Sequence, residues 1–407
     1  MWRGVRAAVC GWCVAAGSAA ADPPGFARAS APEVPCSLPP LLPVPGEGTP
    51  VRPAPSGPGT GPAVEYDRSL LYLPDSVPRS STPTRVEPEE QHFWLSAGVF
   101  QGWSDAQTAP PLLTAPGAAG PVTIFSDGGL SLPYRPGFQF DGGLWLNKDR
   151  TFAVDGGVVY LSPGTDRFEF FSPGSPPLGR PTSTPAGAGT DPLAGPGGAG
   201  WFASEWSTRF VSADVNVRRV FYRDSVFQAA AAAGYRFAYL AEDLSVESSR
   251  VGAFGANHYD DQIGVRNYFH GGQVSLAGGA WWRGWSVDAM AKVGLGVVFA
   301  DSTLAGVSQG TVTQPGSGFL VRPANAGDRS QTQFGVLTAV SVSVGRQVLT
   351  YGKVFAGYTI HQLSGVTRPG DQLDAGDPTG HGLALRRGSG TSDFWVQGLN
   401  LGMEWSY

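Results

Sequence analysis

The sequence predicts an all-β protein, an antiparallel up-and-down transmembrane β-barrel of about ten strands behind a disordered, Pro-rich N-terminal segment. Three observations predict this fold. Strand-like runs alternate apolar and polar residues with a period of two, short and long connections alternate between the runs, and aromatic residues gather near the ends of the runs.

Composition excludes several other classes. The chain has 58 Gly and 35 Pro in 407 residues, without the period of three that collagen requires. Apolar residues make up 42% of it, which is too many for a wholly disordered protein. The net charge of −5 argues against nucleic-acid binding, which needs a basic surface. Turn-rich β structure is the class that remains.

The first 21 residues have the layout of a secretory signal. Arg3 and Arg6 precede an almost uncharged apolar run, and small residues follow up to Ala21, after which we expect cleavage. A misannotated start is the alternative. The two cysteines of the signal would leave with it, so that Cys36 alone remains and no internal disulfide is expected.

The rest of the chain divides into two parts. Residues 22–92 are Pro-rich, and we expect an extended periplasmic spacer without a packed core. Residues 93–407 carry the strand-like runs and are the predicted outer-membrane barrel. No run after the signal has the roughly 20 continuous apolar residues of a membrane helix. A closed barrel is the other structure that can span a bilayer.

Ten candidate strands are expected in the barrel, near 93–103, 136–147, 151–161, 204–221, 226–245, 265–282, 285–299, 331–345, 348–363 and 393–407. Each has one apolar and one polar face. Two further strands, over Val122–Phe125 and Phe168–Phe171, would widen the barrel to twelve.

The connections between these runs differ in length. Four are tight, at 148–150, 222–225, 283–284 and 346–347. The other five are long and rich in Gly, Pro and Ser, at 104–135, 162–203, 246–264, 300–330 and 364–392. Strict alternation would place every tight turn on one rim, as the short periplasmic turns of outer-membrane barrels are placed. The predicted location is therefore the outer membrane, with the lipid bilayer as the surrounding medium.

The last run has apolar or aromatic side chains at every second position: Leu399, Leu401, Met403, Trp405 and Tyr407. This pattern is expected of a signal that the barrel-assembly machinery reads. The alternative is an ordinary terminal strand of a soluble sandwich, which would turn the same face inward. These patterns leave the oligomeric state open.

Four segments resemble a known family. They are Phe93–Ala97, Tyr134–Leu146, Val366–Asp374 with its Arg-Pro-Gly-Asp-Gln sequence, and Asp393–Tyr407. Together they resemble beta barrel porin family seven, a family of outer-membrane barrels typical of planctomycete bacteria. The resemblance covers roughly 93–407. It implies a porin-like barrel, and it brings no catalytic residues with it.

The polar side of the runs supplies the candidate functional residues. If the apolar side faces lipid, these residues face the lumen: Asp141, Asp155, Asp214, Asn216, Arg218, Arg236, Asp288 and Lys292. They could tune ion passage, as charged rings do in pores. The alternative, which a ten-stranded barrel favours, is a cross-strand network that fills and braces a narrow interior.

Two functional interpretations follow for the barrel, namely a narrow passive pore for small solutes and a structural protein with surface-exposed loops. No enzyme activity, metal or cofactor is expected, because none of the five His belongs to a metal-binding motif. One alternative is an outer-membrane hydrolase using His258 and Asp261 on an external loop. Another is a soluble exported β-sandwich that binds carbohydrate.

Overall fold

The computed structural model describes residues 92–407 apart from 108, 118–119, 127–131, 133, 185–186, 254, 311–312, 316, 324, 375–383 and 386–389. The predicted signal and all but the last residue of the predicted spacer lie outside this part. Its strands are β1 (Phe93–Ser104), β2 (Leu113–Gly117), β3 (Gly120–Phe125), β4 (Arg135–Trp145), β5 (Phe152–Ser172), β6 (Leu178–Thr184), β7 (Gly187–Ala194), β8 (Gly198–Arg223), β9 (Phe227–Gly252), β10 (Asn257–Trp282), β11 (Trp285–Gln309), β12 (Thr313–Pro315), β13 (Gly327–Leu349), β14 (Gly352–Val366), β15 (Leu373–Asp374), β16 (Ala384–Leu385) and β17 (Ser392–Ser406). The described residues also form a short 3-10 helix, η2 (Pro369–Gln372). No described helix is long and apolar enough to cross a membrane.

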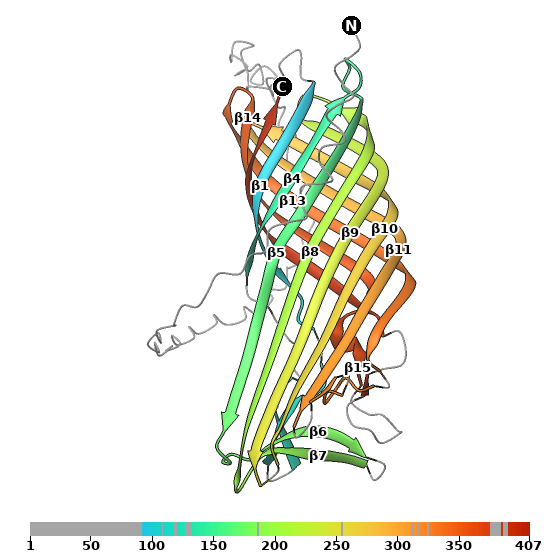
Figure 1. Cartoon of the computed structure of the whole chain (residues 1–407). Coiled ribbons are helices and arrows are strands. Elements are labelled where there is room, and N and C mark those ends of the chain that lie inside the picture. Colours follow the sequence, from blue (N-terminus) through green and yellow to red (C-terminus); the bar gives the residue numbers. More distant parts are fainter. Residues whose placement is uncertain are drawn as a thin grey trace, which may run out of the picture. The chain divides into compact units, whose positions relative to one another are not determined.

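Ten of these strands form a closed antiparallel ring (Figure 1). Its order is β1, β4, β5, β8, β9, β10, β11, β13, β14 and β17, and β17 pairs with β1 to close the ring. Each strand hydrogen-bonds to its neighbour in chain order within the ring, so the connectivity is up-and-down. The predicted fold class is confirmed, with ten ring strands in the described part of the chain.

The prediction of two further ring strands is wrong. Val122–Phe125 lies in β3, which belongs to a separate sheet of order β3-β2-β6-β7. Phe168–Phe171 lies in β5, where it extends a strand that is already in the ring. The ring therefore stays narrow, at the size that side chains can fill.

Several ring strands are much longer than expected. The strands β8, β9 and β10 have 26 residues each and β11 has 25, whereas a spanning strand needs roughly 9–11. The predicted long connection 246–264 is therefore wrong, since only 253–256 lie between β9 and β10. The predicted turn at 346–347 is also misplaced, because β13 continues to Leu349 and the turn falls at Thr350–Tyr351.

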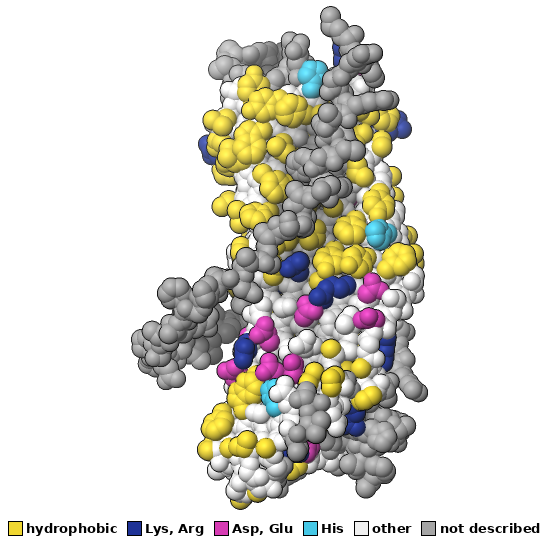
Figure 2. Space-filling model, in the orientation of Figure 1, with side chains coloured by type: hydrophobic (Ala, Val, Ile, Leu, Met, Phe, Trp, Pro, Cys, Tyr) yellow, Lys and Arg dark blue, Asp and Glu magenta, His cyan; other side chains and the backbone are white. Residues whose placement is uncertain are grey.

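The outer face of the ring carries an apolar belt. Side chains of β8, β11 and β17 stand exposed on it, with Val215 52% and Leu401 67% exposed. In Figure 2 apolar side chains cover the part of the described surface nearer the short turns, and charged side chains gather beyond it. A soluble sandwich would bury this face, so that alternative is excluded and the belt faces lipid.

The belt has a defined height. On β9 the outward-facing residues are apolar or aromatic from Phe227 to Tyr239, which spans roughly 30 Å of membrane for a tilted strand. The next row of outward positions holds Arg209, which pairs with Ala241, and Arg266, which pairs with the same Ala241 from the other side. Beyond this row the outer face is polar. The long strands thus form an extension outside the bilayer.

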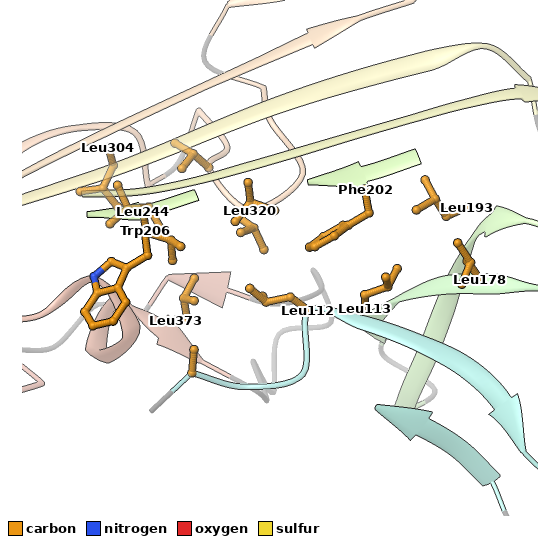
Figure 3. Packing of buried hydrophobic residues seen from close by; sticks show 14 of the residues in the cluster. Leu112, Leu113, Leu178, Leu193, Phe202, Trp206, Leu244, Leu304, Leu320 and Leu373 are labelled. Atoms are coloured by element: carbon orange, nitrogen blue, oxygen red, sulfur yellow. The ribbon is translucent and has the colours of Figure 1, made fainter. Parts of the chain in front are cut away.

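The inner face of this extension holds an apolar core, which is separate from the membrane-spanning part of the ring. Residues of the separate sheet, such as Leu113 and Leu193, pack against Phe202, Trp206 and other inward side chains of β8–β11 (Figure 3). The extension is therefore apolar inside and polar outside, as a soluble barrel is, and the connections between ring strands fill it.

Candidate functional site in the barrel lumen

The structure places all eight candidate lumen residues on the inner side of the ring. Four are less than a tenth exposed: Asp155, Asn216, Arg236 and Lys292. The other four are half-buried: Asp141, Asp214, Arg218 and Asp288. The period of two therefore brings together side chains from strands that are far apart in the sequence.

Ion pairs and hydrogen bonds join these side chains. Lys292 of β11 donates to Asp214 of β8 at 2.8 Å, although β9 and β10 separate the two strands in the ring. Arg218 pairs with Asp155 of the neighbouring strand. Asn216 donates to Asp155 at 2.8 Å and to Asp214 at 2.7 Å. Because the Lys292–Asp214 pair reaches across the lumen, side chains fill the lumen at this level.

Arg236 of β9 lies at the centre of the same network. It is fully buried and donates to His361 Nδ1 of β14 at 3.0 Å, across the ring from its own strand. It also donates to Gln273 and Ser212, each at 3.4 Å. The guanidinium group thus uses its several donors to bind three strands together.

An apolar layer follows on the side of the network away from the short turns. Nine of the ten ring strands contribute buried side chains to it: Phe100, Val159, Leu161, Phe210, Ala238, Leu240, Phe269, Val298, Leu337, Leu363, Val366, Phe394 and Val396. Glycines make room for the largest rings. A Cβ atom at Gly102 or Gly398 would lie 2.6 Å from the ring of Phe100.

A second polar cluster lies near the boundary of the membrane part. Arg368, in the connection after β14, donates to both carboxylate oxygens of Glu242, at 2.9 and 2.8 Å, and to Asp105 at 2.7 Å. Asp371 accepts from the backbone N–H of Arg368 at 3.1 Å and from Ser392 at 2.7 Å. The connection is thereby held inside the barrel.

The alternating pattern of the strands does not predict this cluster. The signal for it lies in the Arg-Pro-Gly-Asp-Gln segment, which carries part of the family resemblance. Arg368 is the Arg of that segment, and Asp371 is its Asp. The segment therefore has a structural explanation as an anchor for the connection after β14.

The polar residues proposed for a hydrolase do not form a catalytic pair. They lie in β10 rather than on a loop, and Asp261 is buried whereas His258 is three residues away on the opposite face of the strand. Asp261 accepts backbone N–H groups of Phe319, Leu320 and Val321, at 3.0, 3.0 and 2.8 Å. Burial raises the pKa of Asp261 to about 6, against the lowering effect of these donors.

Asp261 therefore fixes the segment 319–321 to the inside of the extension. Within the described part of the chain, no group of three or more His, Cys, Asp or Glu side chains could hold a metal ion.

The short-turn mouth of the lumen contains a vestibule of about 830 Å³. Inward side chains of β1, β4, β8, β9, β10, β11, β14 and β17 line it. Lys353 donates to Asp288 at 2.8 Å and pairs with Glu404 at 3.2 Å on its wall. From this mouth inward, the described lumen holds a vestibule, a charged network and an apolar layer in succession.

Comparison with known proteins gives one family match. The model of the family described as "Putative beta barrel porin-7" matches residues 94–407. None of the curated proteins matches the chain.

Solved structures give distant likenesses. Outer membrane protease OmpT from Escherichia coli is 9% identical, with 80% of this chain and 100% of that chain covered and a TM-score of 0.36. The toluene transporter TbuX from Ralstonia pickettii is 8% identical, with 80% and 92% covered and a TM-score of 0.21. An anion-selective porin from Comamonas acidovorans is 9% identical, with 78% and 100% covered and a TM-score of 0.16. At such values the likeness carries no argument about activity.

Proposed function

This chain belongs to the beta barrel porin-7 family and is an outer-membrane β-barrel, and we propose that its lumen is closed and that it works as a structural, surface-exposed barrel. The polar outer face of the extension supplies the exposed surface, and the connections packed inside it form its core. The candidate lumen residues then brace the interior instead of forming an ion path.

The apolar layer carries this proposal. Its side chains come from nearly every ring strand, and those of Phe100, Phe269 and Val298 have no exposed surface. A hydrated ion or polar solute crossing this level would have to shed its water against apolar side chains, and hydrophobic constrictions block pores in this way. The second apolar core in the extension adds another barrier on the same path.

Conductance measurement tests the proposal. Purified full-length protein, shown to be folded by its heat-modifiable gel mobility, is inserted into planar bilayers next to an open porin as positive control. We expect no discrete conductance steps from the folded barrel. Steps of uniform size from the wild-type protein would contradict a closed lumen and favour the passive-pore interpretation.

We also infer that the barrel is not an enzyme. The family is described as a porin family, and the one polar cluster proposed for hydrolysis is divided between the two faces of β10. Substitution of Asp261 should therefore alter the stability of the extension. The cells that carry the variant should keep all their hydrolytic activities. A hydrolytic activity that disappears in both His258→Ala and Asp261→Asn would contradict this inference.

We propose finally that the outward face of β17 is read by the barrel-assembly machinery. Leu399, Leu401 and Tyr407 are well exposed on this face, and Met403 and Trp405 are half-buried. Replacing Leu399 and Leu401 together by Ser should reduce assembled barrel in the outer membrane, whereas Asn400→Ser, on the inner face, should reduce it less. Equal assembly of the two variants would contradict this role.

A further inference from the structure

The vestibule is a blind pocket within the described lumen. Its lining includes the inward side chains of Trp94, Trp145, Trp281, Ser286 and Glu404, together with residues of the short turns. The charged network and then the apolar layer close the lumen behind it. A molecule that enters from the short-turn side therefore meets a floor, and the pocket has the form of a binding site.

Its walls are aromatic. The rings of Trp94 and Trp145 lie 4.9 Å apart at an angle of 44°, and Trp281 comes from β10 in another part of the ring. Glycines allow two of these rings to lie on the strands: a Cβ atom at Gly143 would be 2.4 Å from Trp94, and one at Gly279 would be 3.1 Å from Trp281. The indole rings are thus held in place before any ligand arrives, and the Arg223 guanidinium lies 5.4 Å from the Trp145 ring centre.

Two of the three cations in its described lining are paired with carboxylates. Lys353 lies between Asp288 and Glu404, and Arg218 pairs with Asp155 and stands 5.7 Å from the Trp94 ring centre. These two cations already have carboxylate partners, so an anionic ligand would have to break an ion pair to gain either of them. Arg283, in the turn at the rim, lies 4.9 Å from the Trp282 ring centre. A neutral ligand with hydroxyl groups could instead bond to the outer edges of Asp288 and Glu404, which are 34% and 32% exposed.

We propose that the vestibule binds a short neutral oligosaccharide. The flat faces of sugar rings lie against the Trp faces, and the hydroxyl groups bond to the paired charges around them. The volume of about 830 Å³ falls within the range of about 300–1,000 Å³ for small-molecule sites, which also occur in the mouths of β-barrels. This site goes beyond the structural role proposed above, although its blind form rests on the closed lumen.

Titration of the full-length protein tests the site. The barrel is purified in an amine-oxide detergent, because a detergent with a sugar headgroup would compete, and is titrated with chitotriose and with maltotriose by calorimetry and Trp fluorescence. We expect saturable binding of at least one trisaccharide. Trp145→Ala and Trp281→Ala should weaken it at least tenfold, and Glu404→Gln should weaken it severalfold.

The control is Trp103→Ala, which removes an indole on the outer face of β1, near Tyr134 and Tyr358. This variant should bind as the wild type does. Folding of each variant is checked by heat-modifiable mobility, and Trp145→Phe, which keeps an aromatic face, should retain most of the binding. Absence of saturable binding, equal loss in the Trp103→Ala control, or selective binding of charged peptides or phospholipids would overturn the proposal. Conductance of the wild type would contradict the closed lumen and the blind form of the pocket, whereas saturable binding that is lost in Trp145→Ala would still support the site.

Discussion

Replacing Arg368 by Met should destabilise the barrel far more than removing an exposed ion pair from its outer surface. Arg368 is 2% exposed and Glu242 is fully buried, and two hydrogen bonds of 2.9 and 2.8 Å join them. Methionine is similar in length but carries no charge. The variant would therefore leave the Glu242 carboxylate buried without its main partner, and Asp105 would lose its bond of 2.7 Å as well.

The size of the effect follows from this burial. Removing one member of a buried ion pair costs about 3–5 kcal/mol, because the remaining charge keeps its desolvation cost without compensation. The free energy of unfolding is measured by urea titration of the barrel in lipid vesicles, with Trp fluorescence as the signal. The Glu242→Gln variant should also be destabilised. The double variant should lose less than the two single losses added together, since neither partner is then left alone.

Arg167→Met is the matched control. Arg167 pairs with Glu169 on the outer face of β5, but each side chain of this pair is 50% exposed. Solvent screens such a pair, so the control should unfold as the wild type does. An Arg368→Met barrel that is as stable as the control would refute the reasoning. Additive losses in the double variant would show that Arg368 and Glu242 do not act on one another.

Three other predictions concern different levels of the barrel. Leu401→Arg puts a charge on the lipid-facing belt and should cost about 2–4 kcal/mol near the middle of the membrane, which unfolding in vesicles would measure; an unchanged midpoint would contradict the lipid-facing assignment. Phe269→Ala should cost about 3–5 kcal/mol in the same assay, and a loss under 1 kcal/mol would mean that the apolar layer is loosely packed. The pKa of Asp261 is about 6 in the folded protein, above the ordinary value of 3.8. The protonated carboxyl group therefore stabilises the fold fully below pH 3.8, and this contribution is lost as the pH rises through 6. The unfolding free energy should fall over this window, the Asp261→Asn variant should lack that slope, and an equal slope in both proteins would contradict the effect.

The ring, and which side chains of its strands point to lipid or to the lumen, could be predicted because one physical rule acts along every membrane strand. Lipid on one side and a narrow interior on the other force apolar and polar residues to alternate, as Val215 and Asn216 do. The tight turn at Arg283–Gly284 then joins strands that the same pattern had already identified. The inward positions of Asp214 and Lys292 follow from the same alternation.

The excess length of the runs 204–221, 226–245 and 265–282 predicts that these strands project beyond the bilayer, but the full length of the extension was not predicted because the meaning of the pattern reverses along the strand. Beyond Arg209 and Arg266 the outward residues are polar, such as Asp243, and the inward ones are apolar, such as Leu244. Alternation continues with its faces exchanged, and in a stretch rich in Ser and Gly it has the composition of a loop. The local sequence pattern does not show which face of the extension's strands meets water, because that depends on how far the segment lies from the bilayer.

The apolar layer was missed for a related reason. Its members, such as Leu240 and Val298, occupy inward positions between apolar outward neighbours, so they interrupt the alternation instead of marking it. That they meet in the middle of the ring depends on the register of ten strands. Sequence patterns along single strands do not contain that register.

The seam between the first and last ring strands has a consequence for how the protein is made. Trp94 lies opposite Ser406 and Phe100 opposite Asn400, so contacts that complete the sheet join residues about 300 positions apart. Until β17 has been synthesised and has crossed the inner membrane, both edges of the incomplete sheet have unpaired backbone groups. These groups can form hydrogen bonds with other chains. A copy without β17 cannot close the ring, so we expect resistance to proteases only after the 15 residues of this strand have paired.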